Sequence, residues 1–590
     1  MMLRRLRINH FRGIESLDWV ISQRLIGLIG AGDSTKTTLL EAIGLVLSPS
    51  HSPQFTDADF YLLDVTKNIV IEAAVTGLPD NLIKESQLGK HRSGIMPDGK
   101  LLHDPVDEAE ECLVIRLTVT PDLDPTWDLV RPGTDEARPI SASQRRQLGF
   151  FRLGERPDYH LRWGRGSALS GLTGDGDGAS TIVLDAQREA RAAVFASKPN
   201  ALHSAAAAAQ HSAGKFGAAK FNQLRPGLEP GSASSSHSLI LHDGDVPVSS
   251  LGLGTRRLMS LSIQDQAMAD GSIIAIDEVE HGLEPHRLTH ALHRLKSRAE
   301  AGHLQVIMTT HSPVAVKTLN AVDFVVVQTN GAGVTACIPV PGTLDNVQGT
   351  FRSAPEALLG RRVLVGEGAT EVGFLRALLR HWDFERLEAE QATAAAIGTV
   401  LVNGAGGTQA TQRAHIFRHL GYPTCMLVDN DDRAIDGPVM AALAAGVDVQ
   451  RWSSGNSLED EVIQTLSIEG LQALVNLATD IRGEDQIRDA VGARLSGGRL
   501  GGTDIKGWQA QARADESAVR DAIALAAATK KNEWFKREDR GEELAEVVIA
   551  HWDGLGDTHL MSVIGELREF AYPSATKPIE SDYAEIPAHG

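Results

Sequence analysis

Acidic side chains follow two apolar stretches in the second half of the chain. Glu367 comes at the end of RRVLVG, and Asp429 and Asp431 follow TCMLV further along. Because the carboxyl ends of parallel strands meet at one edge of a sheet, we expect these carboxylates to lie together if the two strands are neighbours. Hard oxygen ligands suit Mg²⁺ or Mn²⁺ better than zinc. The acids therefore predict a site for divalent metal.

A glycine-rich stretch near the start has the spacing of a phosphate-binding loop. GAGDSTKT, residues 30–37, follows the apolar run RLIGLI and precedes TTLLEAIGLVL, which has helical spacing. Such a loop needs backbone N–H groups at a helix start, a lysine charge and a hydroxyl for Mg²⁺. Lys36 and Thr37 can supply the last two, whereas Thr35 stands where glycine is usual and adds a Cβ to a tight turn. The residues that we assign to ATP binding here are Gly30, Gly32, Ser34, Thr35, Lys36, Thr37 and Thr38.

Two later apolar runs end in residues that would complete an ATPase site. Asp277 and Glu278 follow SIIAI, where Asp277 would hold Mg²⁺ through water and Glu278 would orient the attacking water. His311 follows LQVIMTT and is placed to reach the γ-phosphate. Taken alone, each motif has a plain reading as a turn, a solvated strand end or a structural histidine. Their order along the chain favours an ATPase.

The patterns around these motifs predict an α/β protein of two domains. The first, residues 1–355, carries the nucleotide motifs, and the second, residues 356–590, starts with a new α/β pattern at RRVLV. An Ala-rich stretch at about residues 185–235 predicts a helical insertion in the first domain. The insertion is either a solvent-facing helical arm or a dimerisation element. From about residue 465 the second domain is expected to be mostly helical.

Composition and charge limit the function without deciding it. The content of 42% hydrophobic and 23% charged residues is ordinary for a soluble globular protein. We expect no membrane span, no signal peptide and a cytoplasmic location, with the three cysteines reduced. The net charge of −19 argues against a protein that coats nucleic acid with its whole surface. A nuclease is not excluded, because clustered carboxylates contribute to that charge and phosphate contacts need only a local basic patch.

The nucleotide motifs resemble those of the ABC, SMC and Rad50 class of ATPases. SSLGLGT, before the Asp277 strand, resembles their signature motif, with Ser250, Gly252 and Gly254 at the start of a helix whose N-terminus favours an anion. In that class the signature of one subunit meets the nucleotide of another. The resemblance therefore implies ATP at a head-to-head interface and a homodimer or higher even oligomer.

The acidic set resembles the Toprim pattern, and nearly the whole chain apart from the insertion resembles the OLD (overcoming lysogenization defect) family. In that family an ABC-type ATPase precedes a Toprim nuclease. FRG at residues 11–13 and EHGLEP at residues 280–285 also resemble the family, although a histidine is more usual before that proline. The resemblance implies cleavage or nicking of DNA and a role in defence against phage or other foreign DNA.

The same resemblance implies further residues at the metal site. Acids in SLEDE, residues 457–461, stand where OLD proteins hold a second metal, and we assign Glu459 and Glu461 to it. Glu371 lies one helical turn beyond Glu367, faces the same side and would join that site. WFK resembles the late lysine motif of the family, so Lys536 would neutralise the cleaved phosphate. The plain alternatives are a polar helix start for the acids and an ordinary surface lysine.

Three functions compete at this point. In the first, a DNA endonuclease is controlled by its ATPase heads, with the sign of that control left open. In the second, the chain is a sensor or scaffold that recruits an effector, so that Lys36 matters and Glu367 does not. In the third, the Toprim site cleaves RNA such as tRNA, since these motifs do not read a 2′-hydroxyl. A helicase or other defence protein as partner also stays open.

Overall fold

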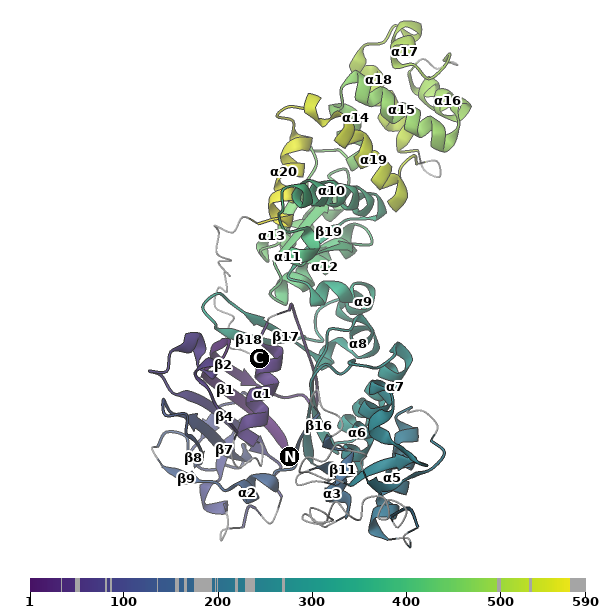
Figure 1. Cartoon of the computed structure of the whole chain (residues 1–590). Helices are drawn as coiled ribbons and strands as arrows, with labels where there is room; N and C mark the ends of the chain where they lie inside the picture. Colours follow the sequence, from purple (N-terminus) through teal and green to yellow (C-terminus); the bar gives the residue numbers. More distant parts are fainter. Residues whose placement is uncertain are drawn as a thin grey trace. The chain divides into compact units, whose positions relative to one another are not determined.

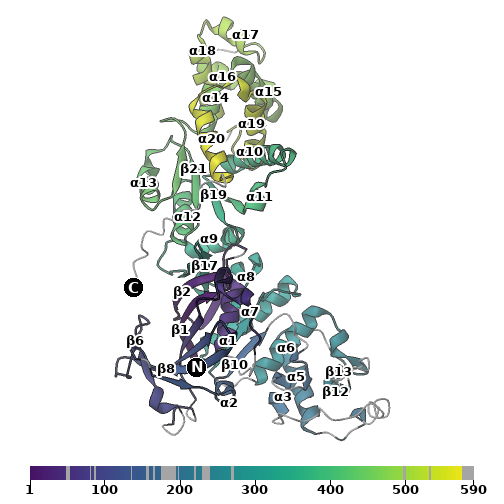
Figure 2. The same ribbon diagram turned by 60° about the vertical axis from the view of Figure 1, so that its left-hand side comes forward.

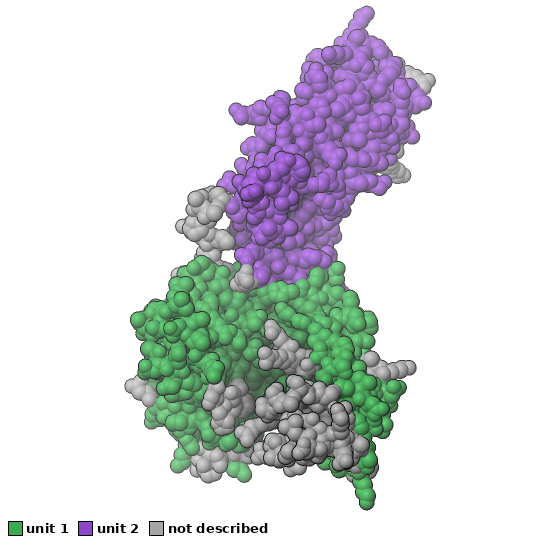
Figure 3. All heavy atoms as spheres, viewed as in Figure 1, with its two compact units in different colours: residues 1–29, 33–340, 581–590 green, residues 30–32, 341–580 purple. Residues whose placement is uncertain are grey.

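The fold is given by a computed structural model, in which the contacts of the chain define two compact units (Figure 3). Unit 1 contains residues 1–29 and 34–340, and unit 2 contains residues 30–32 and 341–573. The contacts divide the chain after Val340, and the predicted domain boundary at 355/356 stays a prediction. The structure describes residues 1–32, 34–47, 53–79, 82–84, 88–134, 136–153, 159–163, 167–173, 194–196, 198, 200–217, 221–228, 239–267, 271–495, 500–529 and 533–573.

Unit 1 contains an antiparallel sheet and a second sheet, and helix α1 (Lys36–Leu47) packs between them. Leu6 and Ile8 show why this core forms, because alternate residues of a strand point to the same face and both are fully buried. The antiparallel strands are, in spatial order, β2 (Ile14–Val20), β1 (Met2–Phe11), β4 (Ile69–Thr76), β7 (Glu110–Val119), β5 (Ser93–Ile95) and β6 (Leu101–Leu102), with β8 (Pro125–Val130) beside β7 and β9 (Ala137–Pro139) beside β8.

The second sheet of unit 1 positions the nucleotide motifs. Its neighbouring strands are parallel except for the antiparallel hairpin that β17 and β18 form. The central strands are buried along their whole length, as expected of a parallel sheet covered on both faces. Their carboxyl ends share one edge. In spatial order the strands are β10 (Phe150–Leu153), β15 (Ser272–Ile276), β16 (Leu304–Thr309), β3 (Leu25–Ile29), β17 (Phe324–Thr329) and β18 (Thr335–Pro339).

A smaller layer of unit 1 combines helices with a short sheet and has its own apolar cluster (Figure 2). The predicted insertion at about 185–235 falls here. Its described part includes helix α5 and strand β12, while residues 185–193 and 229–235 lie outside the described residues. The elements of this layer are α3 (Ala168–Thr173), α5 (Ala201–Lys215), α6 (Leu253–Ala267), β11 (Arg162–Trp163), β12 (Leu224–Leu228), β13 (Leu239–Asp243) and β14 (Val246–Pro247).

Unit 2 is built on a parallel sheet with the order β20-β19-β21-β22. The chain passes from β19 to β20 in one direction and from β20 to β21 in the other. Because such connections are right-handed, α10 covers one face while α12 and α13 cover the other, as Figure 1 shows. The elements are β19 (Arg362–Gly366), α10 (Ala369–Glu388), β20 (Thr399–Asn403), α12 (Gly407–His419), β21 (Thr424–Val428), α13 (Asp436–Ala444) and β22 (Asp448–Arg451).

The C-terminal region of unit 2 is helical, as predicted, and its helices begin with α14 at Leu458. These helices share one apolar core with α10 and the sheet of unit 2. They are α14 (Leu458–Thr465), α15 (Ile468–Arg482), α16 (Glu484–Leu495), α17 (Ile505–Ala512), α18 (Glu516–Ala527), α19 (Glu538–His551) and α20 (His559–Ala571). None of the helices formed by the described residues has the length and apolar character that a membrane crossing requires.

Candidate functional site

Two strand ends of unit 1 bring the predicted magnesium ligands together. Asp277 follows β15, and Thr37 lies in the first turn of α1. The Asp277 carboxylate accepts a hydrogen bond from Thr309 Oγ1 at 2.7 Å and from Thr37 Oγ1 at 3.3 Å. A hydroxyl and a carboxylate at this separation are placed to share one Mg²⁺ with the phosphates of a nucleotide.

The lysine and the histidine of the nucleotide motifs belong to the same site. Lys36 is buried, and its Nζ donates to Ser34 Oγ at 3.0 Å. Burial and the charge of Lys36 lower the pKa of His311, while nearby acids act in the opposite direction. The backbone N–H of His311 donates to Glu280 at 2.6 Å, which fixes the start of the segment after β16. Motifs that are far apart along the chain are therefore neighbours in the folded structure.

Glu278 has an unusual backbone that tertiary contacts stabilise. Its φ is +45°, in the left-handed region that side chains disfavour. Its N–H donates to Thr309 Oγ1 at 2.8 Å, and its carboxylate faces His281 Nδ1 at 3.1 Å. The guanidinium of Arg257, on α6, donates to the carbonyl oxygens of Glu278, at 2.7 Å, and of Asp277. Sequence analysis did not select Arg257, because one arginine on a helix carries no motif.

Replacing Arg257 with methionine should lower ATP hydrolysis by about 10- to 100-fold while nucleotide binding changes little. Arg257 is almost fully buried and holds the backbone of Glu278, so its loss lets that residue leave the left-handed region and misplaces the carboxylate. Steady-state hydrolysis and titration with a fluorescent ATP analogue measure the two effects. Arg287→Met is the matched control, since Arg287, on helix α7 (Pro285–Glu300), pairs with Glu284 at the start of the same helix. Equal losses in both variants would contradict the role of Arg257.

The signature-like segment, residues 249–255, leads into helix α6, which begins at Leu253. Ser250 Oγ donates to the carbonyl oxygen of Pro247 at 2.6 Å. Gly254 is needed for packing, because a Cβ there would come within 2.2 Å of the carbonyl oxygen of Gly282. Gly252 is exposed, and no heavy atom of the described residues lies within 4 Å of the position of a Cβ. Gly252 thus leaves room for a ligand from outside. Gly30 and Gly32 belong to unit 2 by their contacts, and their phosphate role, like that of Thr38, stays a prediction.

In unit 2, the structure brings Glu367 and Asp429 together at the carboxyl ends of neighbouring parallel strands. β19 and β21 pair in parallel, with Gly366 opposite Leu427. The Glu367 carboxylate accepts from the N–H of Asp429 at 2.9 Å and from the N–H of Gly407 at 3.0 Å. This is where the order of the strands reverses, the place at which open α/β sheets bind ligands.

Burial and mutual repulsion perturb the carboxylates of this cluster. Burial, followed by the charges of Glu371 and Glu459, raises the pKa of Asp429 to about 9. Burial and the charge of Glu459 raise the pKa of Glu371 to about 7. Asp429 Oδ1 accepts from the N–H of Leu458 at 2.9 Å, so it also holds the start of α14. Clustered acids with such shifts are typical of functional sites.

Lys536 supplies a positive charge to the same cluster. Its Nζ lies 3.7 Å from Glu459 Oε2. Burial alone would lower the pKa of Lys536, but the surrounding carboxylates, Asp431 among them, outweigh this effect and raise it. The ammonium group is therefore charged at neutral pH and available to a phosphate.

Two predicted metal ligands in the first turn of α14 differ in their surroundings. Glu461 is satisfied by the preceding loop, since its oxygens accept from Ser453 Oγ at 3.0 Å, Ser453 N–H at 3.1 Å and Asn456 Nδ2 at 2.8 Å. Glu459 is buried, and its Oε2 has no hydrogen-bond partner. The geometry favours Glu459 over Glu461 as a ligand, and both metal roles stay predictions.

The donor set of the cluster fits a divalent cation. Among the described residues, no three acidic, histidine or cysteine side chains are already arranged as a metal-binding group. Glu367 and Asp429 each accept backbone hydrogen bonds instead. Two buried oxygens, Glu371 Oε1 and Glu459 Oε2, have no hydrogen-bond partner. A buried carboxylate oxygen without a donor is costly, and a hard cation removes that cost.

Close helix packing places Lys536. Thr370 Oγ1, at the start of α10, donates to the carbonyl oxygen of Phe535 at 3.2 Å. A Cβ on Gly541 of α19 would come within 2.2 Å of the carbonyl oxygen of Thr370, and one on Gly373 within 1.9 Å of that of Glu538. The two glycines let α10 and α19 approach closely, and this approach brings the loop before α19 to the carboxylates.

Gly541→Ala should therefore cost about 1–3 kcal/mol of stability and more than about tenfold in any activity of this cluster. The added methyl group meets backbone, which cannot rotate away, so α19 and Lys536 must move. Thermal unfolding and the cleavage assay proposed below measure the two effects. Gly565 lies on the exposed side of α20, and no heavy atom of the described residues lies within 4 Å of the position of a Cβ there. Gly565→Ala should therefore leave the activity unchanged and leave the stability unchanged or raise it. Similar behaviour of the two variants would contradict the packing argument.

Two family models match the chain. Residues 25–317 match the model described as "AAA domain, putative AbiEii toxin, Type IV TA system". Residues 358–431, which include Glu367 and Asp429, match the TOPRIM domain of overcoming lysogenization defect protein-like sequences. The chain belongs to the OLD family. Its fold is an α/β ATPase domain followed by a Toprim domain with a parallel sheet and a helical C-terminal region, which confirms the predicted fold class.

Solved structures similar to this OLD-family chain are heads of SMC proteins. The SmcHead bound to the C-winged helix domain of ScpA is 15% identical and covers 58% of this chain and 98% of its own, with a TM-score of 0.36. The Smc head domain with an extended coiled coil, bound to the C-terminal domain of ScpA and derived from Pyrococcus furiosus, is 13% identical. It covers 57% of this chain and 95% of its own, with a TM-score of 0.36. The SMC head domain from Thermotoga maritima is 13% identical and covers 58% of this chain and 100% of its own, with a TM-score of 0.30. Because these TM-scores are below 0.5, the assignment rests on the family models. A search of curated proteins finds no relative.

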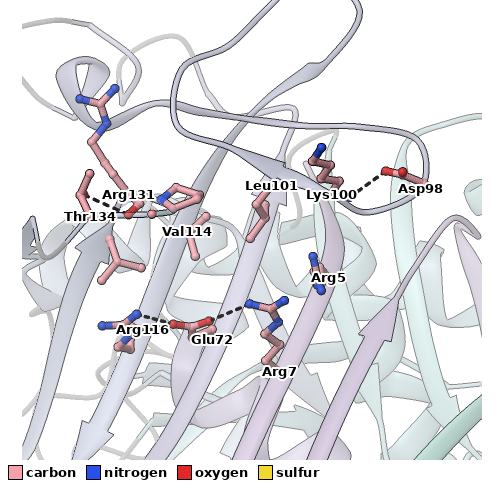
Figure 4. A pocket seen from close by; sticks show the side chains of 13 residues that line it. Arg5, Arg7, Glu72, Asp98, Lys100, Leu101, Val114, Arg116, Arg131 and Thr134 are labelled. Carbon is pink, nitrogen blue, oxygen red and sulfur yellow. Dashed lines mark hydrogen bonds and ion pairs between the residues drawn. The ribbon is translucent and has the colours of Figure 1, made fainter. Parts of the chain in front are cut away.

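A pocket of about 510 Å³ in the ATPase domain of the OLD-family chain lies on the open face of the antiparallel sheet (Figure 4). Arg7 and Arg116 flank Glu72 across three neighbouring strands. The arginines pair with acids as follows: Arg5 and Arg7 with Asp18, Arg7 and Arg116 with Glu72, and Arg131 with Asp104. These pairs offset much of the positive charge of the arginines, and we assign the pocket no ligand.

Proposed function

We propose that this chain is an ATP-regulated, divalent-metal-dependent DNA endonuclease that nicks or cleaves DNA, in defence against phage or other foreign DNA. The observation that carries the proposal is the carboxylate cluster of Glu367, Glu371, Asp429 and Glu459 at the strand reversal, with Lys536 beside it. A structural cluster would pair its acids with hydrogen-bond donors, whereas two buried oxygens here have none.

Each residue of the cluster has a distinct task in this proposal. Glu367 and Asp429 accept hydrogen bonds from backbone N–H groups, which fix the orientation of each carboxylate. Glu371 and Glu459 offer the oxygens that have no hydrogen-bond partner, and Asp431 adds an exposed carboxylate near Lys536. Two divalent cations held there would activate a water and stabilise the leaving 3′ oxygen. Lys536 would hold the phosphate being cleaved by a charge-assisted hydrogen bond.

Nucleotide would act at the ATPase domain. Lys36 and Thr37 would bind the phosphates and Mg²⁺, Asp277 would complete the magnesium shell and Glu278 would orient water. The exposed Gly252 would face the nucleotide of a second copy, which makes a homodimer the expected assembly. ATP would then change the equilibrium between head arrangements and thereby the cleavage rate.

Cleavage of supercoiled plasmid with Mg²⁺ or Mn²⁺ tests this proposal. We expect nicked or linear product from the wild type and none from Glu367→Ala. Lanes with and without ATP, repeated with Lys36→Ala, give the sign of nucleotide control. Persistent cleavage by Glu367→Ala would remove the Toprim cluster from catalysis. If neither protein cleaves DNA and the wild type cuts RNA instead, the chain is a ribonuclease. If the wild type cleaves neither DNA nor RNA, the result favours the sensor or scaffold function.

A further inference from the structure

Thr35 stands at the junction between the phosphate-binding loop and helix α1, and its backbone is left-handed. Its φ is +63°, a region that a β-branched residue adopts only when its surroundings enforce it. Its carbonyl oxygen accepts the N–H of Leu39 at 2.9 Å, so Thr35 caps the helix whose N-terminus would face the phosphates of a nucleotide. The φ of this residue sets the angle at which the loop joins the helix.

Three threonine hydroxyls form a triangle around this residue. Thr35 Oγ1 lies 3.0 Å from Thr329 Oγ1 and 3.5 Å from Thr335 Oγ1, and Thr329 and Thr335 are 3.0 Å apart. Thr35 Oγ1 also donates to the carbonyl oxygen of Ser34 at 2.7 Å. One proton per hydroxyl satisfies the set: Thr35 donates to Ser34, Thr329 to Thr35, and Thr335 to Thr329.

The partners of Thr35 lie on a rigid support. Thr329 and Thr335 are directly opposite each other in the β17–β18 hairpin. On the other side, the methyl group of Thr35 packs against the β1–β2 turn, where a Cβ on Gly13 would be only 3.2 Å from Thr35 Cγ2. The next side chain along the chain is Lys36, whose ammonium group contacts Ser34. Thr35, which belongs to the triangle, therefore lies in the chain between Lys36 and the serine that the ammonium group of Lys36 contacts.

We infer that Thr35 is a positioning residue of the nucleotide site, held in its left-handed conformation by Thr329 and Thr335. This rests on the ATP-binding half of the proposed function. Glycine at this position would adopt the same φ freely, so it needs no anchor. Threonine needs the anchor, because without it the backbone relaxes to the extended region and the loop leaves the helix N-terminus. The two hairpin hydroxyls thus matter for nucleotide affinity only while residue 35 carries a Cβ.

A double-mutant cycle on the full chain tests this dependence. The variants are Thr329→Val, Thr35→Gly and both together, with dissociation constants measured for a fluorescent ATP analogue in Mg²⁺. Thr329→Val should weaken binding about fivefold, the effect of one net hydrogen bond, and by less than about twofold when residue 35 is glycine. Thr35→Val, which keeps the shape and loses the hydroxyl, should weaken binding by tenfold or more. Thr35→Ser should restore it.

The control is Thr318→Val, which removes a hydroxyl that donates to the carbonyl oxygen of Val314 in its own helix α8 (Pro313–Thr318) and should leave binding unchanged. Equal effects of Thr329→Val in the wild type and in the Thr35→Gly background would overturn the inference, and so would unchanged binding in Thr329→Val. If the wild type fails to bind the analogue, the ATP half of the proposed function fails. The role of Thr329 in holding Thr35 is then tested by thermal unfolding without nucleotide. Thr329→Val should lower the Tm only when residue 35 is threonine.

Discussion

Replacing Asp429 with asparagine should reduce DNA cleavage by about three orders of magnitude or more and make the metal-free protein more stable at pH 8. Asparagine has the same shape, and its oxygen can still accept the N–H of Leu458. It removes a carboxyl group that must either take up a proton on folding or carry a buried charge that Glu371 and Glu459 repel, and both cost stability at pH 8. A residue that only supported the fold would not combine lost activity with gained stability.

The stability gain has a defined pH window. The folded-state pKa of Asp429 is raised to about 9 and that of Glu371 to about 7, above the unfolded values of about 4. The folded protein therefore holds these protons more tightly, and stability is lost as pH rises from about 4 through about 9. In Asp429→Asn the loss of stability should be smaller and should level off above about pH 7, the pKa of Glu371.

Differential scanning calorimetry in EDTA at pH 5 and pH 8 checks this, together with plasmid cleavage in Mn²⁺. At pH 8 the Tm of unit 2 should rise by at least about 3 °C, the shift that about 1 kcal/mol gives in a unit of this size. Glu469→Gln, which removes an exposed acid from the first turn of α15, is the control. A lower Tm at pH 8 in Asp429→Asn would show that the charge is accommodated by the fold and would contradict our reading of the cluster.

Mg²⁺ or Mn²⁺ should stabilise unit 2 through Glu459. At a concentration about 100-fold above the dissociation constant, a cation that binds only the folded state contributes about 2.7 kcal/mol. For a unit of this size the Tm rises by roughly 5–10 °C. Glu459→Gln should abolish most of this rise, because it replaces a buried oxygen that has no hydrogen-bond partner by an uncharged amide.

Glu461→Gln separates the two acids of α14. It should lower the Tm without metal, since Glu461 accepts three hydrogen bonds from residues 453–456, and the rise on adding metal should remain. The opposite pattern, with the metal effect lost in Glu461→Gln and kept in Glu459→Gln, would reverse the assignment. No metal effect in the wild type would remove the metal from the proposed mechanism.

The sequence determined the order of the two α/β domains and most of the chemistry at their strand ends. An apolar run that ends in acids is a local pattern, and parallel strands place their carboxyl ends at one edge of a sheet. The proximity of Glu367 and Asp429 could therefore be predicted from the sequence. The same reasoning placed Asp277 and His311 beside Lys36, and unit 1 has them there.

Only the tertiary structure decided which way the side chains on helices face and what supports them. Glu459 and Glu461 are equivalent by sequence, yet the phase of α14 turns one toward Lys536 and the other toward the loop before it. Arg257, the glycine contact between α10 and α19, and the threonine triangle all depend on pairs far apart in the chain. No local pattern encodes such pairs, because their energy comes from packing and hydrogen bonds that exist only after the elements have docked.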